Sequence, residues 1–426
     1  MRKNNFKKNF SFSESPEIDL DLRPNIGVII SPQYDLSNIF YLEYNRVLEE
    51  IQKYYEIMLA ANMKVPPYYV KSFLNLKNPF ARLRRIRYFI SLSNVSPFFN
   101  IVRCGLDSVS DKQLTRRLHS FFKVQNSDIF YTFPLYPDLF SIRLATEKST
   151  KIVVEFWEDQ IEHLWDSLRN NRISRKHSGL EKTRGYDWLK QVIKFSDKMI
   201  VPTKVLQERL KCLGASRQQI SVVPVCQDEF MPRDPYRVRK KHGLTDQKIL
   251  FYLGSLTTYH DLNTLLRSLN MVKSSDLILI IAGGSYSKIK KYQRLIDASK
   301  VPVLYLGRLK PVDLEYYISA ADICLGIYRF EEPSGFFPGS VIKFMLASKA
   351  IVATDLPEIR EMFKNERACL FVQQQNIKQL ASAIDFFVNN PEERTKLGRT
   401  ARKISEKNYL WKNHTLKIKQ IFDKLI

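Results

Sequence analysis

The chain has 426 residues, 44% of them apolar, and a formal net charge of +23. This length exceeds what one hydrophobic core usually organises, so we expect two domains of roughly 200 residues each. No apolar run approaches the roughly 20 residues that a membrane-spanning helix needs, which excludes a helical membrane protein. Five scattered cysteines without a CxxC spacing favour reduced thiols in a cytosolic protein over a disulfide framework.

The first half of the chain predicts strands that alternate with helices, after a flexible polar tail over residues 1–23. No apolar run follows the basic residues at the start of this tail, so we do not expect a secretory signal. Alternation of this kind is typical of βαβ units on a parallel sheet. The predicted strands are 25–31, 100–104, 128–133, 151–156, 199–202 and 220–224, and the predicted helices are 37–62, 111–125, 137–146, 178–195 and 203–213.

Residues 64–123 carry a concentrated positive charge, with twelve Lys or Arg side chains against two Asp, and aromatic residues are interleaved among them. Such a surface attracts anions, and an anionic membrane leaflet and nucleic acid both fit. A solvated basic face that only maintains solubility is the simpler reading. Of the two anionic partners we favour the membrane surface and regard nucleic acid as unlikely.

The second half predicts a cleaner α/β alternation after a charged linker at 229–246. We therefore expect two doubly wound α/β domains, at 24–228 and 247–408, and a C-terminal helix over 409–426 that packs back on the first domain. Ligands are expected at the carboxyl ends of the strands, in a cleft between the domains. The predicted strands are 248–253, 277–282, 303–306, 323–326, 350–353 and 368–372, and the predicted helices are 263–273, 287–298, 312–321, one opened by Ser340, 377–389, 391–407 and 413–426.

The segment from Phe337 to Glu358 contains the clearest candidate for an anion site. Its sequence predicts a turn at Pro338-Gly339, a helix that begins at Ser340 and a buried strand from Ala350. The first backbone N–H groups of a helix lack partners within the helix, and the helix dipole places positive charge behind them. A loop that leads directly into a helix therefore predicts a site for a phosphate group.

The order of motifs in the second half resembles the donor-binding domain of glycosyltransferase family 4, whose members have the GT-B fold. The resemblance covers about residues 24–426 and is weak before residue 197. It rests on these segments in order: Leu253-Gly-Ser-Leu256, Leu262-Asn-Thr-Leu-Leu266, Ile280-Ile-Ala-Gly-Gly284, Tyr305-Leu-Gly-Arg-Leu309, Ser319-Ala-Ala-Asp-Ile323 and Phe337 to Glu358.

The resemblance implies a retaining transferase that binds a nucleotide diphosphate sugar without a metal. Helix N-termini and cations stabilise the charge that grows on the diphosphate as the glycosidic bond breaks. Ser255 stands where the family has Arg, and His260 stands where it has Lys. The family also has a pair of Glu residues: the first falls on Gly335 here, and the second, which contacts ribose, falls on Lys343. The residues that this resemblance assigns to the donor are Gly254, Ser255, His260, Arg308, Gly339, Ser340 and Lys343.

Acidic residues at the end of a first-domain strand are the candidates for acceptor binding and catalysis. Glu155, Glu158 and Asp159 follow the strand, and His163 lies four residues beyond Asp159. We assign Glu158 and Asp159 as catalytic, because carboxylates there can orient an acceptor hydroxyl. Ordinary surface carboxylates are the alternative. Lys204, at a predicted helix start, is a further weak candidate for contact with phosphate.

The resemblance thus implies a cytoplasmic GT-B glycosyltransferase that acts on a glycan or lipid-linked acceptor, and the basic region predicts a peripheral position on the cytoplasmic face of a membrane. No cofactor is expected, since the six histidines lack metal-ligand spacing. Lys343 can supply a missing positive charge, or it can mark a homologue that has lost donor binding and acts as a partner subunit. Another enzyme on the same fold, such as a nucleotide-sugar epimerase, is the third alternative.

Overall fold

The computed structural model describes residues 25–30, 47, 50–51, 53–61, 88–91, 128–133, 150–156, 189–257, 259–330, 337–364 and 366–426. The tail at 1–23 lies outside the described residues. So do the predicted strand at 100–104, the predicted helices at 111–125 and 137–146, and all of the basic region at 64–123 except a short strand.

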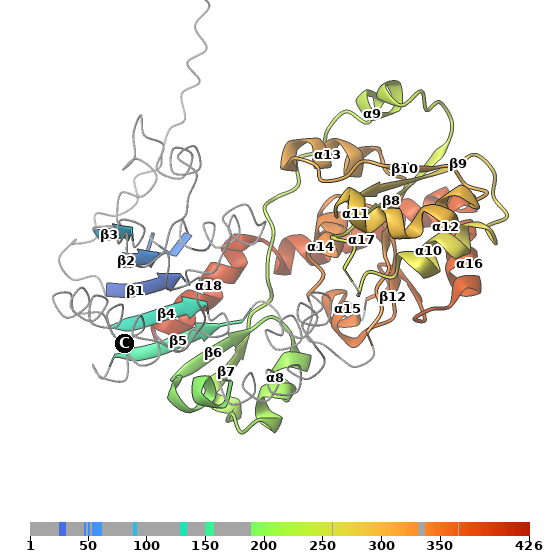
Figure 1. The fold of residues 1–426 in the computed structure, drawn as a ribbon. Helices are drawn as coiled ribbons and strands as arrows, with labels where there is room; N and C mark the ends of the chain where they lie inside the picture. Colours follow the sequence, from blue (N-terminus) through green and yellow to red (C-terminus); the bar gives the residue numbers. More distant parts are fainter. Residues whose placement is uncertain are drawn as a thin grey trace, which may run out of the picture.

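The first domain is built on a seven-stranded sheet with the strand order β3-β2-β1-β4-β5-β6-β7 (Figure 1). Every neighbouring pair in it is parallel. Residues 189–195 are helical, as predicted for the end of helix 178–195, and α8 covers Lys204–Cys212. The strands are β1 (Asn25–Ile30), β2 (Glu56–Ala61), β3 (Tyr88–Ser91), β4 (Ile129–Phe133), β5 (Lys151–Glu155), β6 (Lys198–Val201) and β7 (Ile220–Val222).

The predicted helix over 37–62 is wrong in its second half. Residues 47, 50 and 51 are helical, but the chain turns at 53–55 and continues as β2. Glu56 pairs with Asn25, and the parallel register continues to Ala61 opposite Ile30. A short apolar run fits a buried strand and a buried helix equally well by periodicity, and here strand pairing decides. The unpredicted β3 adds the next strand beside β2.

The second domain is built on a six-stranded parallel sheet in the order β10-β9-β8-β11-β12-β13. All six strands lie where the sequence predicts them. This agreement has a simple cause, because every residue of β9 and β12 is buried and such strands read as continuous apolar runs. The strands are β8 (Lys248–Leu253), β9 (Leu277–Ala282), β10 (Val303–Tyr305), β11 (Ile323–Gly326), β12 (Ala350–Thr354) and β13 (Leu370–Val372).

The helices of the second domain follow the predicted order, with three differences. The predicted helix 287–298 is broken into α11, a 3₁₀ turn at Lys290–Tyr292 and α12. Pro357 begins the short helix α15, which was not predicted, and the stretch expected as a linker contains α9. The helices are α9 (Tyr236–Lys241), α10 (Leu262–Leu269), α11 (Tyr286–Ile289), α12 (Gln293–Asp297), α13 (Pro311–Ala320), α14 (Gly339–Leu346), α15 (Pro357–Met362), α16 (Ile377–Asn389), α17 (Pro391–Asn408) and α18 (Trp411–Phe422).

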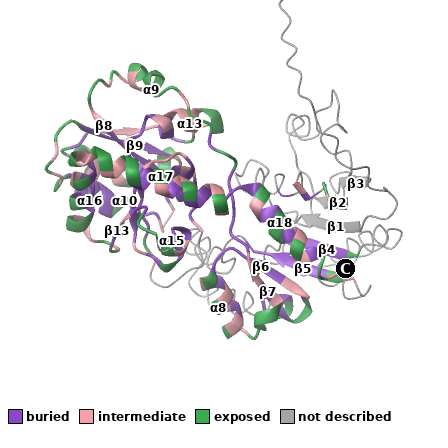
Figure 2. Ribbon diagram, turned by 180° about the vertical axis from the view of Figure 1, so that it is seen from behind, coloured by how far each residue is buried: buried purple, intermediate pink, exposed green. Residues whose placement is uncertain are grey.

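Helix α9 packs on the second domain. Its Val238 is buried, and the guanidinium of Arg237 lies 4.4 Å from the centroid of the Tyr316 ring on α13. Arg239 forms an ion pair of 3.1 Å with Asp322. Figure 2 shows buried residues along strands such as β4 and β5 of the first sheet and β8 and β9 of the second, and exposed residues on helices such as α9 and α16.

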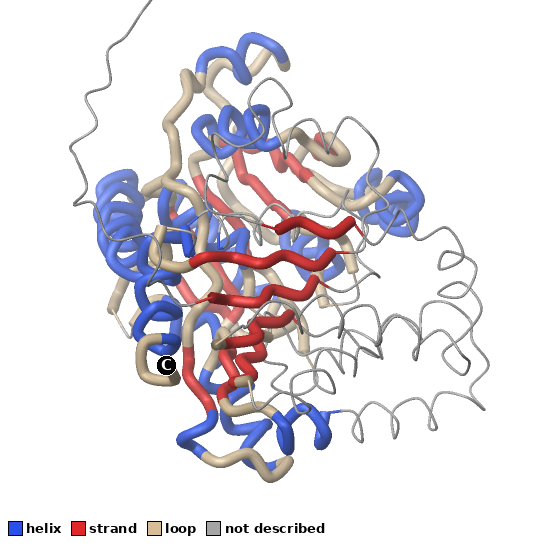
Figure 3. The backbone as a smooth tube through the Cα atoms, turned by 90° about the vertical axis from the view of Figure 1, so that its left-hand side faces the viewer, coloured by secondary structure: helices blue, strands red, loops and turns tan. Residues whose placement is uncertain are grey.

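Two chain crossings join the domains, and they hydrogen bond to each other. The Gln227 N–H donates to the Tyr409 carbonyl at 2.9 Å, and the Trp411 N–H donates to the Gln227 carbonyl at 3.3 Å. After the second crossing, α18 returns to the first sheet, where Phe422 packs edge-on against Tyr131 of β4. Two parallel-sheet α/β domains with this returning helix form the GT-B fold that the sequence predicts (Figures 1 and 3).

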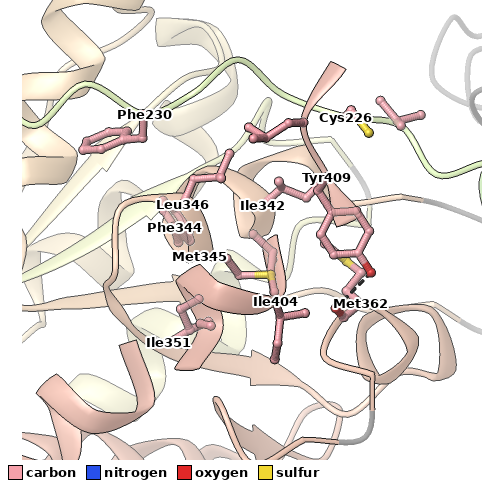
Figure 4. Packing of buried hydrophobic residues seen from close by; sticks show 14 of the residues in the cluster. Cys226, Phe230, Ile342, Phe344, Met345, Leu346, Ile351, Met362, Ile404 and Tyr409 are labelled. Atoms are coloured by element: carbon pink, nitrogen blue, oxygen red, sulfur yellow. Dashed lines mark hydrogen bonds between the residues drawn. The ribbon is translucent and has the colours of Figure 1, made fainter. Parts of the chain in front are cut away.

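Helix α14 is held by apolar contacts on most of its surface. Ile342, Met345 and Leu346 are buried in a cluster with Ile404 and Tyr409 from the end of the chain (Figure 4). The Tyr409 hydroxyl donates to the Met362 carbonyl at 2.9 Å. The start of α14 is therefore a rigid part of the second domain.

Candidate functional site

Loops that follow neighbouring strands of the second sheet meet at its carboxyl edge. The Gly254 N–H, after β8, donates to the Ala282 carbonyl at 3.1 Å. The Gly283 N–H, after β9, donates to the Gly307 carbonyl at 2.7 Å. Because the strands are parallel, Ser255 and Arg308 lie on the same edge of the sheet. This is the edge where open α/β sheets bind ligands.

Glycines allow these loops to approach closely. A Cβ atom on Gly254 would lie 2.3 Å from Cδ2 of the His260 ring, and one on Gly283 would lie 2.2 Å from the Gly254 carbonyl oxygen. Gly283 also has a φ of +99°, which L side chains rarely adopt. The glycines therefore allow the loops after β8 and β9 and the His260 ring to pack closely together, while the next residue, Ser255, is exposed.

His260 is buried and neutral, so it does not provide the positive charge of the Lys that the resemblance places there. Its Nδ1 lies 2.8 Å from Thr257 Oγ1, and Tyr259 and Tyr328 pack against its ring. Burial, and to a lesser extent the Lys288 ammonium, lower the pKa of His260 to about 3. The ring packs over Gly254, and its assignment as a residue that contacts the donor stays a prediction.

Tyr328, which the sequence analysis missed, links the loop after β8 to α14. Its ring centroid lies 5.5 Å from that of His260, and its hydroxyl lies 2.7 Å from Ser340 Oγ. No side chain caps the N-terminus of α14, where Gly339 and Ser340 are the first residues. The structure thus brings Gly254, His260 and Ser340 into one contact chain. The signal for Tyr328 was a polar aromatic residue two positions after a buried strand.

Lys343 contacts the crossing between the domains. Its Nζ donates to Oε1 of Gln227, and a Cβ atom on Gly339 would lie 3.3 Å from Nε2 of the same Gln227 side chain. The Gln227 amide therefore lies beside the first turn of α14. Lys343, the cation predicted for this site, lies one turn beyond Ser340, and its hydrogen bond to Gln227 orients its side chain.

Lys288 is a second residue that the sequence analysis missed. It lies on α11 after β9, is partly buried, and its Nζ donates to the Ser255 carbonyl at 2.9 Å. Burial, then the charges of Arg308 and Lys291, lower the pKa of the Lys288 ammonium. Arg308 itself is exposed. A lysine within a run of basic residues gave no signal in the sequence, because only the fold brings it to Ser255.

In the first domain, Glu155 does not lie free for an acceptor. It is buried, its Oε1 lies 3.0 Å from Nε2 of His414 on α18, and the Tyr131 hydroxyl donates to its Oε2. This corrects the expectation that Glu155 binds sugar hydroxyls. Glu158, Asp159 and His163 lie outside the described residues, as does Gly335.

Lys204, at the start of α8, faces a carboxylate of the second domain. Its Nζ lies 4.0 Å from Oε1 of Glu361 on α15, and its backbone N–H donates to the same carboxylate at 3.3 Å. Among the residues that the structure describes, no cluster of three metal-ligating side chains is found. In that same part of the chain, no helix is long and apolar enough to cross a membrane.

Comparison with known proteins places these loops in a family domain. Residues 236–404 match the family model described as glycosyl transferases group 1. Spore coat protein SA of Bacillus subtilis (strain 168) is 22% identical over 199 residues, which cover 44% of this chain. The match spans about half the length of that relative, 52%.

Solved structures of glycosyltransferases share the fold over both domains. A glycosyltransferase from Rickettsia africae ESF-5 has a TM-score of 0.72 at 15% identity, covering 95% of this chain and 99% of that one. Anabaena Alr3699/HepE, in complex with UDP, has a TM-score of 0.68 at 13% identity, covering 94% and 100%. WaaG, a glycosyltransferase involved in lipopolysaccharide biosynthesis, has a TM-score of 0.64 at 11% identity, covering 93% and 99%.

Proposed function

We propose that this protein is a glycosyltransferase that moves a sugar from a nucleotide diphosphate donor to a glycan or lipid-linked acceptor. The observation that carries the proposal is the family match over residues 236–404, because this range contains every donor residue assigned above. The exposed Ser255 after β8 and the uncapped start of α14 support it, since both can donate hydrogen bonds to a diphosphate.

In the proposed reaction, the bond between the anomeric carbon and the β-phosphate oxygen breaks, and the diphosphate leaves with the electron pair. The acceptor oxygen bonds to the anomeric carbon and loses its proton. Negative charge therefore grows on the leaving diphosphate, where preorganised N–H groups and cations lower the barrier most. Ser255, Arg308, Ser340 and Lys343 are the proposed donors of these contacts, and Glu158 and Asp159 the proposed acceptor-side carboxylates.

We extend the proposal to retention of anomeric configuration, as in glycosyltransferase family 4, and to a role in polysaccharide or glycoconjugate synthesis. The basic region at 64–123 is the proposed contact with an anionic membrane that presents the acceptor. Support for this contact comes from its charge in the sequence alone.

A thermal-shift panel of UDP, GDP, ADP and dTDP, with their glucose conjugates, tests donor binding. UDP is the first to try, because Anabaena HepE was crystallised with UDP and with UDP-glucose. We expect one nucleotide to raise the melting temperature and Arg308→Ala to reduce that shift. A panel without any shift would refute donor binding.

The second candidate is a non-catalytic GT-B homologue that serves as a partner subunit. Two observations favour it: His260 is neutral, and Lys343 stands where the family has a carboxylate. Measurement of donor hydrolysis separates the two functions, because a transferase slowly passes its sugar to water. A nucleotide that binds without any turnover, with or without acceptors, would support the partner subunit.

A further inference from the structure

The first loop of the donor domain lacks the two cations expected there. Ser255 is neutral, and His260 is buried with a pKa of about 3. A diphosphate at this loop would therefore meet backbone N–H groups without a compensating charge from the loop itself. A charge-assisted hydrogen bond is roughly twice as strong as a neutral one, so this loss is substantial.

A different helix brings a cation to the same place. The Lys288 Nζ lies 2.9 Å from the Ser255 carbonyl oxygen, at the residue where the family Arg would stand. An ammonium group has three N–H donors, so two remain after the bond to Ser255. The side chain is thus anchored over the loop after β8 while it can still donate to a ligand.

The surroundings of Lys288 favour an anion. In the described part of the chain, its charged neighbours are Arg308 and Lys291, and both oppose its positive charge. The backbone that carries Arg308 is held at this edge of the sheet, because the Gly283 N–H donates to the carbonyl of Gly307, the preceding residue. Two cations held together at the edge of a sheet, next to a glycine loop, form a site that an anion stabilises.

We propose that Lys288 and Arg308 together bind the diphosphate of the donor, and that Lys288 replaces the missing cation of the first loop. This assignment rests on the proposed function for the identity of the ligand. The anion site itself follows from the contacts of Lys288, Ser255 and Arg308.

The test compares Lys288→Met with Lys290→Met. The second variant is the control, because Lys290 is an exposed lysine two residues further along the chain and its loss removes the same charge. Titration calorimetry with UDP, uridine and inorganic pyrophosphate measures the affinities. We expect Lys288→Met to lower the affinity for UDP and for pyrophosphate by about 10-fold to 100-fold, as for one lost charge-assisted hydrogen bond. The affinity for uridine should fall by less than about twofold. Lys290→Met should change each affinity by less than about threefold.

Restoring the charge from the loop gives an independent check. Ser255→Arg in the Lys288→Met background should recover at least about half of the lost affinity in logarithmic terms. The assignment would be overturned if Lys288→Met and Lys290→Met lowered the affinity for pyrophosphate equally. It would also be overturned if Lys288→Met lowered the affinities for UDP and uridine equally. Binding of pyrophosphate that depends on Lys288, without binding of any nucleotide, would keep the anion site and refute the proposed function.

Discussion

The buried pair of Glu155 and His414 should contribute strongly to the docking of α18, and Glu155→Gln tests it. The two side chains are 1% and 0% exposed and lie 3.0 Å apart. His414 Nδ1 also lies 2.8 Å from the Pro224 carbonyl. Removing one partner of a buried ion pair costs about 3–5 kcal/mol, because the other partner stays buried without its counter-charge. At about 2–4 °C per kcal/mol, we expect a melting temperature lower by about 6–20 °C.

The same pair predicts a defined pH dependence. Burial alone disfavours the charged ring, but Glu155 and a hydrogen bond with Cys226 raise the pKa of His414 to about 10. In the unfolded chain a histidine has a pKa of about 6.5. Protonation therefore stabilises the folded protein fully below about pH 6.5, and this contribution is lost as the pH rises toward 10.

Melting curves of wild type and Glu155→Gln at intervals from pH 6.5 to 10 measure both effects. The gap between the two proteins should be widest near pH 6.5 and should narrow toward pH 10. Glu208→Gln is the control, because Glu208 pairs with Lys211 at 2.7 Å on the surface and its loss should cost less than about 1 kcal/mol. A gap that is independent of pH, or one as small as that of Glu208→Gln, would refute the reasoning.

Three further predictions concern the donor domain. Gly254→Ala should weaken UDP binding by about 5-fold to 150-fold in calorimetry, since its Cβ would lie 2.3 Å from the His260 ring and displacing the loop by overpacking costs about 1–3 kcal/mol. Unchanged affinity would show that the loop can shift freely. Gly398→Ala should lower thermal stability by about 1–3 kcal/mol without a specific effect on nucleotide affinity, because its Cβ would lie 2.2 Å from the Ser348 carbonyl oxygen. Because His260 becomes protonated only near pH 3 and below, the affinity for UDP-glucose should depend on pH equally in wild type and in His260→Asn between pH 5.5 and 8. A steeper dependence in wild type would mean that the ring titrates in this range.

The second sheet was predictable because its central strands are buried on both faces. Strands such as β9 and β12 are unbroken apolar runs bounded by turn residues, so their ends are marked in the sequence. The start of β2 is different, because Glu56 follows a helical stretch without a glycine or proline between them. There only the pairing with β1 decides between helix and strand.

Only the parts of the candidate site that lie in recognisable sequence motifs were predictable from the sequence. Gly254 lies in a loop after a strand, and Gly339 and Ser340 begin a helix, and the alternation of strands and helices identifies both places. Lys288, Tyr328 and the pairing of Glu155 with His414 depend on contacts between distant parts of the chain. The charge of His260 also depends on burial, which its position after a strand does not reveal.

The hydrogen bonds between the two crossings at Gln227 restrict how the halves of the molecule can move. Two neighbouring backbone segments that are hydrogen bonded at one residue resist sliding past each other but permit rotation about that residue. The Gln227 side chain, which accepts a hydrogen bond from Lys343, extends from this residue. A rotation of one half against the other about this residue would therefore move a side chain that contacts Lys343 and lies beside Gly339 at the start of α14.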